Sequence, residues 1–357
     1  MTSPFEPLTF QRGPAWKNRF VLAPLTNSQS HADGVLSDDE QNWLLKRAQG
    51  GFALTMTCAA HVQAQGQGFP GQLGIFADKH LEGLTGLAEA IHAAGSVSSV
   101  QLHHAGMRSP AELIGHAPVC PSDNAEFSAR GLTTKEVEEL IEDFVLAAQR
   151  ADQAGFDGVE LHGAHGYILG QFLSSEINQR SDQFGGSLQN RARPLLEIIQ
   201  KIRSRCREDF QLGVRLSPER FGMQLEEVME LAGSLMSDGA IDYLDMSLWD
   251  SFKEPEQESM RGRSLLSCFT ELDRGQVRLG VAGKIRSVAD VQSALDQGVD
   301  FVMLGRAAIL HADFPDQARA NADFRQTDLP VTRAYLQEQG LGEAFIDYMS
   351  SWPGFVA

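Results

Sequence analysis

The stretch FDGVELHGAHGYILGQFLSSEINQRSDQFGGSLQNR (residues 156–191) predicts a buried β-strand that is followed at once by polar side chains. The apolar positions of the strand are Phe156, Val159 and Leu161. His162, His165 and Tyr167 come where this short apolar run would end. Two imidazoles and a phenol form a donor set that can hold a substrate oxygen and deliver a proton, so the stretch predicts both a strand and a chemical site.

Short apolar segments of this kind recur along the chain and alternate with amphipathic helical patterns. The expected strands span 19–25, 52–60, 97–102, 158–162, 211–216, 242–247, 277–282 and 301–305. The expected helices span 38–48, 81–94, 134–154, 191–205, 226–237, 265–274 (a weak pattern), 288–297 and 314–321. Eight βα units predict a closed parallel barrel, the (β/α)8 or TIM fold of the α/β class. A doubly wound open sheet is the alternative, but APLTNSQSH at 23–31 is not the glycine-rich turn expected after its first strand.

The chain has 357 residues, a length that α/β barrels reach as one domain. We therefore expect a single domain over 1–357, with the barrel at about 18–321 and a C-terminal helical extension at about 322–357. The extension contains four aromatic residues that predict packing on the barrel or on a second subunit: Phe345, Tyr348, Trp352 and Phe355. The segment 105–132 contains three prolines and is expected to be a loop at the catalytic mouth.

Composition narrows the classes of partner. The net charge of −17 argues against binding to nucleic acid or to an anionic membrane, because phosphates would be repelled. The sequence contains no run of about 18 apolar residues, so we expect no membrane span. We also expect no secretion signal, because the N-terminal segment lacks an apolar stretch and a cleavage site. The four cysteines are Cys58, Cys120, Cys206 and Cys268. They form no CxxC pair, so we expect no metal site and a reduced, cytoplasmic protein.

Active sites of parallel barrels lie at the C-terminal ends of the strands. Besides the two histidines and the tyrosine, the residues expected there include Pro24, Leu25, Thr26, Ala59, Gln101, Arg215, Ser247 and Trp249. Gly283 and Gly305 end the last two strands, and Lys284 and Arg306 follow them. Barrels often bind a phosphate through backbone N–H groups at this place, so the spacing predicts a phosphate site. The alternative is that both glycines only allow the turns.

Five segments resemble the old yellow enzyme family of FMN-dependent ene-reductases. They are HGAHGYILGQFLSSEINQRSDQFGGSLQNRAR at 162–193, NRFVLAPLT at 18–26, VQLHHAG at 100–106, VRLSPE at 214–219 and FVMLGRAAI at 301–309. The resemblance runs from about residue 5 to residue 320 and follows all eight expected strands. It implies a TIM barrel that binds FMN noncovalently and takes electrons from NADPH or NADH.

The resemblance also implies which residues hold the flavin. The implied set is Pro24, Leu25, Thr26, Ala59, Gln101, Arg215, Gly283, Lys284, Gly305 and Arg306. In the family pattern Thr26 bonds flavin O4, Gln101 pairs with the pyrimidine edge, and Arg215 stands near N1 and O2. A fixed cation there stabilises the negative charge that grows on reduction. Gly283, Gly305 and Arg306 would hold the phosphate, whereas Lys284, where many relatives have glycine, would contact the phosphate or point to solvent.

For the substrate, the resemblance implies that His162 and His165 grip the carbonyl oxygen of an enone or enal. Flavin N5 would deliver hydride to the β-carbon, and Tyr167 would protonate the α-carbon. A phenol is neutral at pH 7, so its proton is available. Trp249 would stack on the substrate or, equally, pack against the protein.

Other residues of the matching segments have structural interpretations. We expect structural roles for His103 and His104, and a buried thiol at Cys58, where many relatives have glutamate. Loop-holding ion pairs and helix caps are expected from Arg180, Asp182, Asn190 and Arg191.

Two functional alternatives stay open. An NAD(P)H oxidase or a flavin/quinone reductase would keep the flavin and use oxygen or quinone as acceptor. A non-catalytic binding barrel is the other, and the intact His–His–Tyr set argues against it. A homodimer and a homotetramer are both compatible with the aromatic tail.

Overall fold

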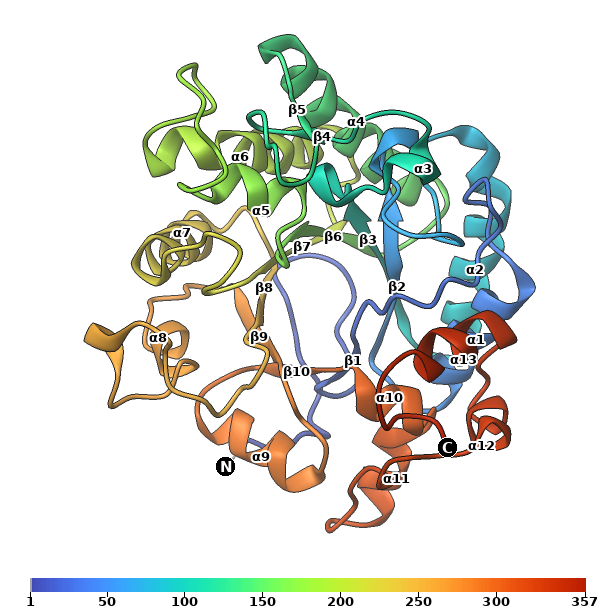
Figure 1. Cartoon of the computed structure of the whole chain (residues 1–357). Coiled ribbons are helices and arrows are strands. Elements are labelled where there is room, and N and C mark those ends of the chain that lie inside the picture. The colour runs from blue at the N-terminus through green and yellow to red at the C-terminus, as the bar shows by residue number, and fades with distance from the viewer. Residues whose placement is uncertain (1) are drawn as a thin grey trace.

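The computed structural model describes residues 2–357, and its centre is a closed barrel of parallel strands. The strands are β1 Phe20–Leu22, β2 Leu54–His61, β3 Val97–His103, β6 Gly158–Gly163, β7 Gln211–Leu216, β8 Tyr243–Ser247, β9 Arg278–Ala282 and β10 Phe301–Leu304. They close in the order β1-β10-β9-β8-β7-β6-β3-β2. Figure 1 looks along the barrel and shows the helices around its outside. The expected (β/α)8 fold is confirmed.

Helices cover the barrel because each one buries an apolar stripe against the strands. Their bounds are α1 Asp38–Gln49, α2 Leu81–Ala93, α4 Thr134–Gln153, α6 Leu188–Arg205, α7 Leu225–Asp238 and α9 Val288–Asp296. In α4, buried Val137, Leu140, Ile141 and Phe144 repeat at helical spacing. A capping box begins α4, since the Thr133 hydroxyl accepts from the backbone N–H of Glu136 and the Glu136 carboxylate accepts from the backbone N–H of Thr133.

Three expected elements differ from the structure by more than two residues at one end. The strand expected at 19–25 is only Phe20–Leu22, because Pro24 has no N–H to donate to a neighbouring strand. The weak helix at 265–274 is reduced to α8, Ser267–Thr270, because Asp273 Oδ1 accepts from the backbone N–H of Gly275 and turns the chain. The helix expected from residue 191 begins at Leu188, since the Ser187 hydroxyl caps it through the N–H of Asn190.

The segment 105–132 is more ordered than the expected loop. It contains helix α3, Ala111–Ile114, and strands β4, Val119–Cys120, and β5, Arg130–Gly131, which pair in parallel. Arg180 fastens this segment to the loop before α6. Its guanidinium donates to the backbone carbonyl oxygens of Pro121 (2.8 Å) and Leu132, and its Nε donates to Asp182 Oδ1 at 2.9 Å. The expected loop-holding ion pair is therefore confirmed.

The N-terminal segment closes the end of the barrel where the strands begin, and Figure 1 shows it crossing behind the ring. Trp16 is fully buried there, with its ring 5.0 Å from that of Phe301 and 5.5 Å from that of Tyr243. Its indole N–H donates to Gln211 Oε1 at 3.1 Å. Because this end is filled, the C-terminal ends of the strands are left to form the site.

The C-terminal part folds back over the barrel of its own chain. Its helices are α10 Arg306–Leu310, α11 Phe314–Ala320, α12 Arg333–Glu338 and α13 Glu343–Ser350. Phe345 of α13 packs edge-on against Trp43 of α1, with ring centroids 4.8 Å apart. Packing of the tail on the barrel is confirmed. Within residues 2–357, no helix combines the length and apolarity needed to cross a bilayer.

Candidate active site

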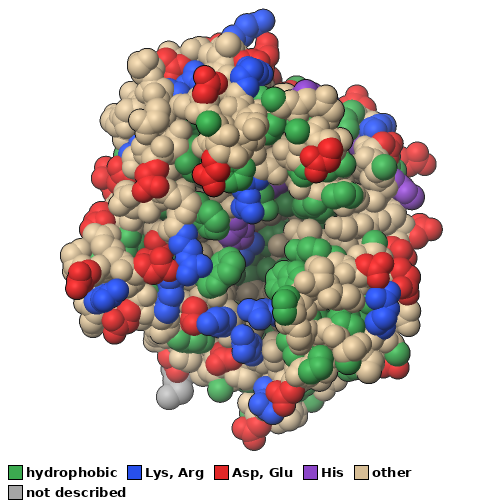
Figure 2. Space-filling model, in the orientation of Figure 1, with side chains coloured by type: hydrophobic (Ala, Val, Ile, Leu, Met, Phe, Trp, Pro, Cys, Tyr) green, Lys and Arg blue, Asp and Glu red, His purple; other side chains and the backbone are tan. Residues whose placement is uncertain are grey.

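Two adjoining cavities of about 270 Å³ and about 190 Å³ open at the C-terminal end of the barrel. Figure 2 shows a hollow at this face, lined by apolar and histidine side chains and bordered by Lys and Arg. The expected residues in the larger cavity are Pro24, Leu25, His165, Arg215, Ser247, Trp249, Gly283, Lys284, Gly305 and Arg306. Those in the smaller cavity are Pro24, Leu25, Thr26, Ala59, Gln101, His162, His165, Tyr167 and Arg306. Every residue expected at the site therefore lines at least one cavity.

The two histidines and the tyrosine come together because the chain turns sharply after β6. His162 lies within that strand, while His165 and Gly166 have φ values of 58° and 68°. This left-handed turn folds the segment back, and Tyr167 precedes helix α5, Ile168–Leu173. The ring of His162 is 5.0 Å from that of His165 and 5.1 Å from that of Tyr167.

Burial keeps both imidazoles neutral. It lowers the pKa of His165 to about 3 and the pKa of His162 well below its usual range, and the positive charge of Arg215 acts in the same direction. The backbone N–H of Ala164 lies 3.4 Å from His162 Nδ1 and points to it, which places the ring proton of His162 on Nε2. His165 Nε2 pairs with the Ser247 hydroxyl at 2.8 Å.

Tyr167 stays a protonated phenol. Burial raises its pKa, and this is partly opposed by Arg108, whose guanidinium lies 4.8 Å from the centre of the phenol ring. Arg108 also donates to the backbone carbonyl oxygen of His165. A proton donor and two neutral hydrogen-bonding rings thus face one small cavity.

Beneath the cavities, four polar side chains meet inside the barrel. Gln101 Nε2 donates to Glu160 Oε1 at 2.7 Å. Arg215 Nε lies 2.7 Å from Asp245 Oδ2, but its N–H is not directed at that oxygen, so the contact is an ion pair without a hydrogen bond. Sequence reasoning assigned no role to Glu160 or Asp245, although an acid within a buried strand is itself a signal.

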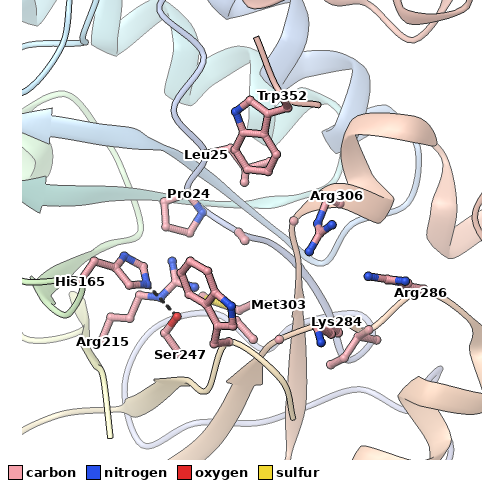
Figure 3. Close-up of a pocket in the computed structure, with 16 residues that line it drawn as sticks. Pro24, Leu25, His165, Arg215, Ser247, Lys284, Arg286, Met303, Arg306 and Trp352 are labelled. Atoms are coloured by element: carbon pink, nitrogen blue, oxygen red, sulfur yellow. Dashed lines mark hydrogen bonds between the residues drawn. The ribbon is translucent and has the colours of Figure 1, made fainter. Parts of the chain in front are cut away.

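The far end of the larger cavity is cationic. Figure 3 places Lys284, Arg286 and Arg306 on one side and His165, Arg215 and Ser247 on the other. The Lys284 side chain is 43% exposed, and its Nζ pairs with Asp250 Oδ2 at 2.9 Å, a partner that was not expected. Its contact with a phosphate stays a prediction. Within residues 2–357, the guanidinium groups of Arg286 and Arg306 make no hydrogen bond or ion pair, and burial together with Arg286 lowers the pKa of Arg306.

The backbone at Gly283 is packed closely against the loop that follows β8. A Cβ added to Gly283 would lie 3.0 Å from the backbone nitrogens of Asp250 and Ser251. The donor set fits FMN in three respects: two unpaired guanidiniums suit a phosphate, an apolar wall suits a flat ring, and Gln101 and Arg215 suit its polar edge.

The rim contains residues that sequence reasoning did not assign to the site. Tyr348, Met349 and Trp352 come from the C-terminal tail, and Phe69 follows β2. The aromatic residues of the tail indicated that it packs on something, but the tail is far in sequence from the barrel strands, so its position at the rim could not be predicted. Trp249 is 60% exposed and lies under Arg220, so it does not have the packing role that we considered.

The structural interpretations of nearby residues are largely upheld. Cys58 is buried, and its pKa is raised by burial and by Glu40, as expected for an inert thiol. His104 accepts from the N–H of Gly106 at 2.9 Å and pairs with Gln63. His103 is less purely structural than expected, since it lines the smaller cavity with its ring 4.3 Å from that of Tyr167.

Comparisons with known proteins agree with this geometry. Residues 3–324 match the NADH:flavin oxidoreductase / NADH oxidase family. The probable NADH-dependent flavin oxidoreductase YqiG of Bacillus subtilis is 36% identical over 317 residues, which cover 86% of this chain and 85% of that protein. The NADPH dehydrogenase of Halalkalibacterium halodurans is 33% identical, over 86% of this chain and 91% of that protein. The NADH:acrylate oxidoreductase of Vibrio harveyi is 34% identical, but this chain spans only 32% of its length.

Solved structures give the same result. The old yellow enzyme homologue from Zymomonas mobilis superposes with a TM-score of 0.82 at 27% identity, covering 97% of this chain and 99% of that one. Morphinone reductase in complex with tetrahydroNAD superposes with a TM-score of 0.79 at 29% identity, covering 98% and 97%. The chain belongs to the NADH:flavin oxidoreductase / NADH oxidase family and is an FMN-dependent NAD(P)H oxidoreductase of the old yellow enzyme type.

Proposed function

We propose that this oxidoreductase reduces the activated C=C bond of α,β-unsaturated carbonyl compounds such as cyclic enones and enals. The observation that carries the proposal is the grouping of neutral His162, neutral His165 and protonated Tyr167 beside an apolar cavity with a cationic end. Bound FMN, reduced by NADH or NADPH, supplies the hydride. The other tasks fall to the side chains of this chain.

The imidazoles polarise the acceptor. The Nε2–H of His162 and one ring N–H of His165 donate to the carbonyl oxygen, which draws electron density away from the β-carbon. Because both rings are neutral, they act through hydrogen bonds rather than through positive charge. Donors of this kind stabilise a developing enolate by a few kcal/mol.

Tyr167 completes the addition by giving its phenolic proton to the α-carbon. NAD(P)H, one proton and the unsaturated carbonyl compound then yield NAD(P)⁺ and the saturated product, and solvent returns the proton to the phenolate. Arg108 above the ring favours the transient phenolate by its charge. Gln101, Arg215, Gly283, Lys284, Gly305 and Arg306 are assigned to FMN in this proposal.

A Tyr167→Phe variant tests the assignment. Loss of a general acid lowers the rate by about 10²–10⁴-fold, and we expect that loss for cyclohexenone reduction. Bleaching of the flavin by NAD(P)H should stay within about twofold. Tyr348→Phe is the matched control, because Tyr348 lines the same cavity and should tolerate the change. Equal enone reduction by the Tyr167→Phe variant and the wild type would refute the role of Tyr167.

The second candidate is an NAD(P)H oxidase or a flavin/quinone reductase. It is favoured by the 35% identity, over 319 residues, to the NADH oxidase of Thermoanaerobacter brockii, although this chain spans 48% of that protein. Neither oxygen nor quinone needs protonation at carbon. Oxygen or quinone turnover that exceeds enone turnover at saturating NADH, and that Tyr167→Phe leaves unchanged, would support this candidate instead.

A further inference from the structure

Two carboxyl groups lie inside the barrel beneath the cavities, where the reactions proposed above leave them without a task. Glu160 on β6 and Asp245 on β8 are each 0% exposed. Arg215 lies on β7 between these strands and is 5% exposed. In the sheet register Arg215 is opposite Asp245 on one side and His162 on the other. One buried cation is therefore opposite Asp245, and its charge also acts on Glu160, with which it forms no ion pair within residues 2–357.

The contacts of the two acids differ. Asp245 has the ion pair with Arg215, at 2.7 Å, although neither of its oxygens accepts a hydrogen bond within residues 2–357. Glu160 has one hydrogen bond, accepted by Oε1 from Gln101 Nε2, while its Oε2 has no partner within residues 2–357. A buried carboxylate is costly unless a cation lies beside it, and a second ionised acid nearby adds to that cost. Burial raises the pKa of Asp245 as well, but the adjacent Arg215 opposes that rise, whereas Glu160 has no ion-pair partner within residues 2–357. The arrangement favours an ionised Asp245 and a proton on Glu160.

The surrounding charges agree. Burial and the neighbouring Asp245 raise the pKa of Glu160 to about 8, against the opposing effects of Arg215 and Gln101. The remaining titratable group facing Glu160 is the phenol of Tyr243 on β8, and burial keeps that phenol neutral. We call Arg215, Asp245 and Glu160 together the floor of the cavities. At pH 7 the floor then has one positive charge on Arg215, one negative charge on Asp245 and one neutral acid, Glu160.

Glu160 also fixes the orientation of Gln101. One Nε2–H of the amide points down to the carboxyl group, so the amide oxygen and the second N–H remain for the cavity that Gln101 lines. With the proton of Glu160 on the unpartnered Oε2, Oε1 is an acceptor, and the Gln101 amide N–H is the group that pairs with it. The carboxyl group thus presents Gln101 in one orientation toward any ring above it.

We propose that Glu160 is a positioning residue for the flavin, which orients Gln101 from below and holds a proton that keeps the floor under the flavin from becoming negative. The proposal rests on the flavin-binding roles given above to Gln101 and Arg215, but not on the identity of the electron acceptor. If Glu160 ionises, the floor gains a negative charge beneath the edge where reduction adds negative charge. Reduction then draws a proton from solvent onto Glu160.

The protonation state of Glu160 can be measured from the number of protons that the holoenzyme takes up on reduction. Below about pH 8, reduction of the holoenzyme by two electrons takes up one proton, at the flavin. Above that pH, Glu160 starts ionised and takes up a second proton. For a two-electron couple, a tenfold change in proton concentration is worth about 30 mV per proton. The midpoint potential should therefore fall by about 30 mV per pH unit at pH 7 and by about 59 mV per pH unit above pH 8.

The experiment is a dye-coupled potentiometric titration of the FMN holoenzyme from pH 6 to pH 9.5, without any alkene. The steepening should disappear in Glu160→Gln, which keeps the shape and the bond to Gln101 but cannot ionise. In Asp245→Asn, Glu160 loses its like-charged neighbour while the opposing charge of Arg215 remains, so the steepening should move to lower pH.

Three results would overturn the proposal: a wild type without the steepening, a steepening that persists in Glu160→Gln, or one that Asp245→Asn leaves in place. Far-UV circular dichroism and FMN affinity identify a variant that fails to fold, in which case the other variant decides. Because no acceptor is present, failure of the enone assignment would leave these results unchanged.

Discussion

The hydrogen bond between Ser247 and His165 decides which nitrogen of the His165 ring carries the proton. The two atoms, Ser247 Oγ and His165 Nε2, are 2.8 Å apart. If the hydroxyl donates, the ring proton lies on Nδ1, and that nitrogen can donate to a carbonyl oxygen. The ring is neutral, because burial lowers its pKa to about 3, so it has one N–H to place. A Ser247→Ala variant removes this control and leaves the ring free to adopt either tautomer.

The magnitude follows from the kind of bond that is lost. A hydrogen bond between neutral groups contributes about 1 kcal/mol net. Ser247 borders the open cavity, so water can reach the freed ring nitrogen and no buried group is left without a partner. About 1 kcal/mol corresponds to about a fivefold fall in the rate at which pre-reduced enzyme is oxidised by low cyclohexenone concentrations. Stopped-flow absorbance of the flavin measures this rate directly.

A double-mutant cycle with His165→Ala isolates the effect. Without the imidazole, Ser247→Ala should change the same rate by less than about twofold, since the hydroxyl acts through the ring. A fivefold loss in the His165→Ala background would show that Ser247 acts independently of His165. An unchanged rate in the single variant would show that the tautomer does not limit the reaction. Either result refutes the reasoning.

Two further predictions concern stability. Asp182 accepts from Arg180 Nε at 2.9 Å, and bonds to Arg180 are the main reason that its pKa is lowered to about 2. The contribution of Asp182 to the free energy of unfolding is therefore fully present above about pH 4 and is lost as pH falls toward 2. Asp182→Asn should lower the free energy of unfolding in urea at pH 7 by about 1 kcal/mol, a figure reduced for solvent screening. Gly213→Ala would place a Cβ 2.1 Å from the buried Tyr243 ring and should cost about 3 kcal/mol or more, whereas Gly233→Ala, with nothing within 4 Å, should not destabilise. Equal melting temperatures for the two alanine variants, or an Asp182→Asn protein with wild-type acid stability, would contradict these predictions.

The sequence predicted the barrel and the residues at its mouth because both depend on local rules. Short apolar strands alternating with amphipathic helices define the fold, and parallel strands bring their C-terminal ends together. Gln101 and Arg215 could therefore be placed from their positions at strand ends. Trp352 could not, because the tail that carries it is held by contacts between distant parts of the chain, such as the packing of Phe345 on Trp43.

The roles of the buried acids Glu160 and Asp245 were not predicted, for a different reason. Glu160 seemed only to interrupt an apolar run, because a single strand does not show that Gln101 from the neighbouring strand pairs with it. Lys284 is a similar case. Its partner Asp250 comes from the loop after β8, and no local pattern links the two. Polar pairs across a barrel depend on register and side-chain direction, which periodicity alone does not specify.

In the proposed function, the charged group assigned to the cofactor and the neutral groups assigned to the substrate are different side chains. Arg215 is a cation because its guanidinium cannot release a proton and Asp245 lies beside it. Burial holds His162 and His165 in their neutral forms, and the charge of Arg215 adds to this effect. If the imidazoles were charged, they would repel Arg215 and would bind anions such as chloride or free carboxylates in place of a neutral carbonyl oxygen. In the proposed function, a cation below and neutral donors above therefore let the flavin accept charge while an uncharged acceptor is still selected.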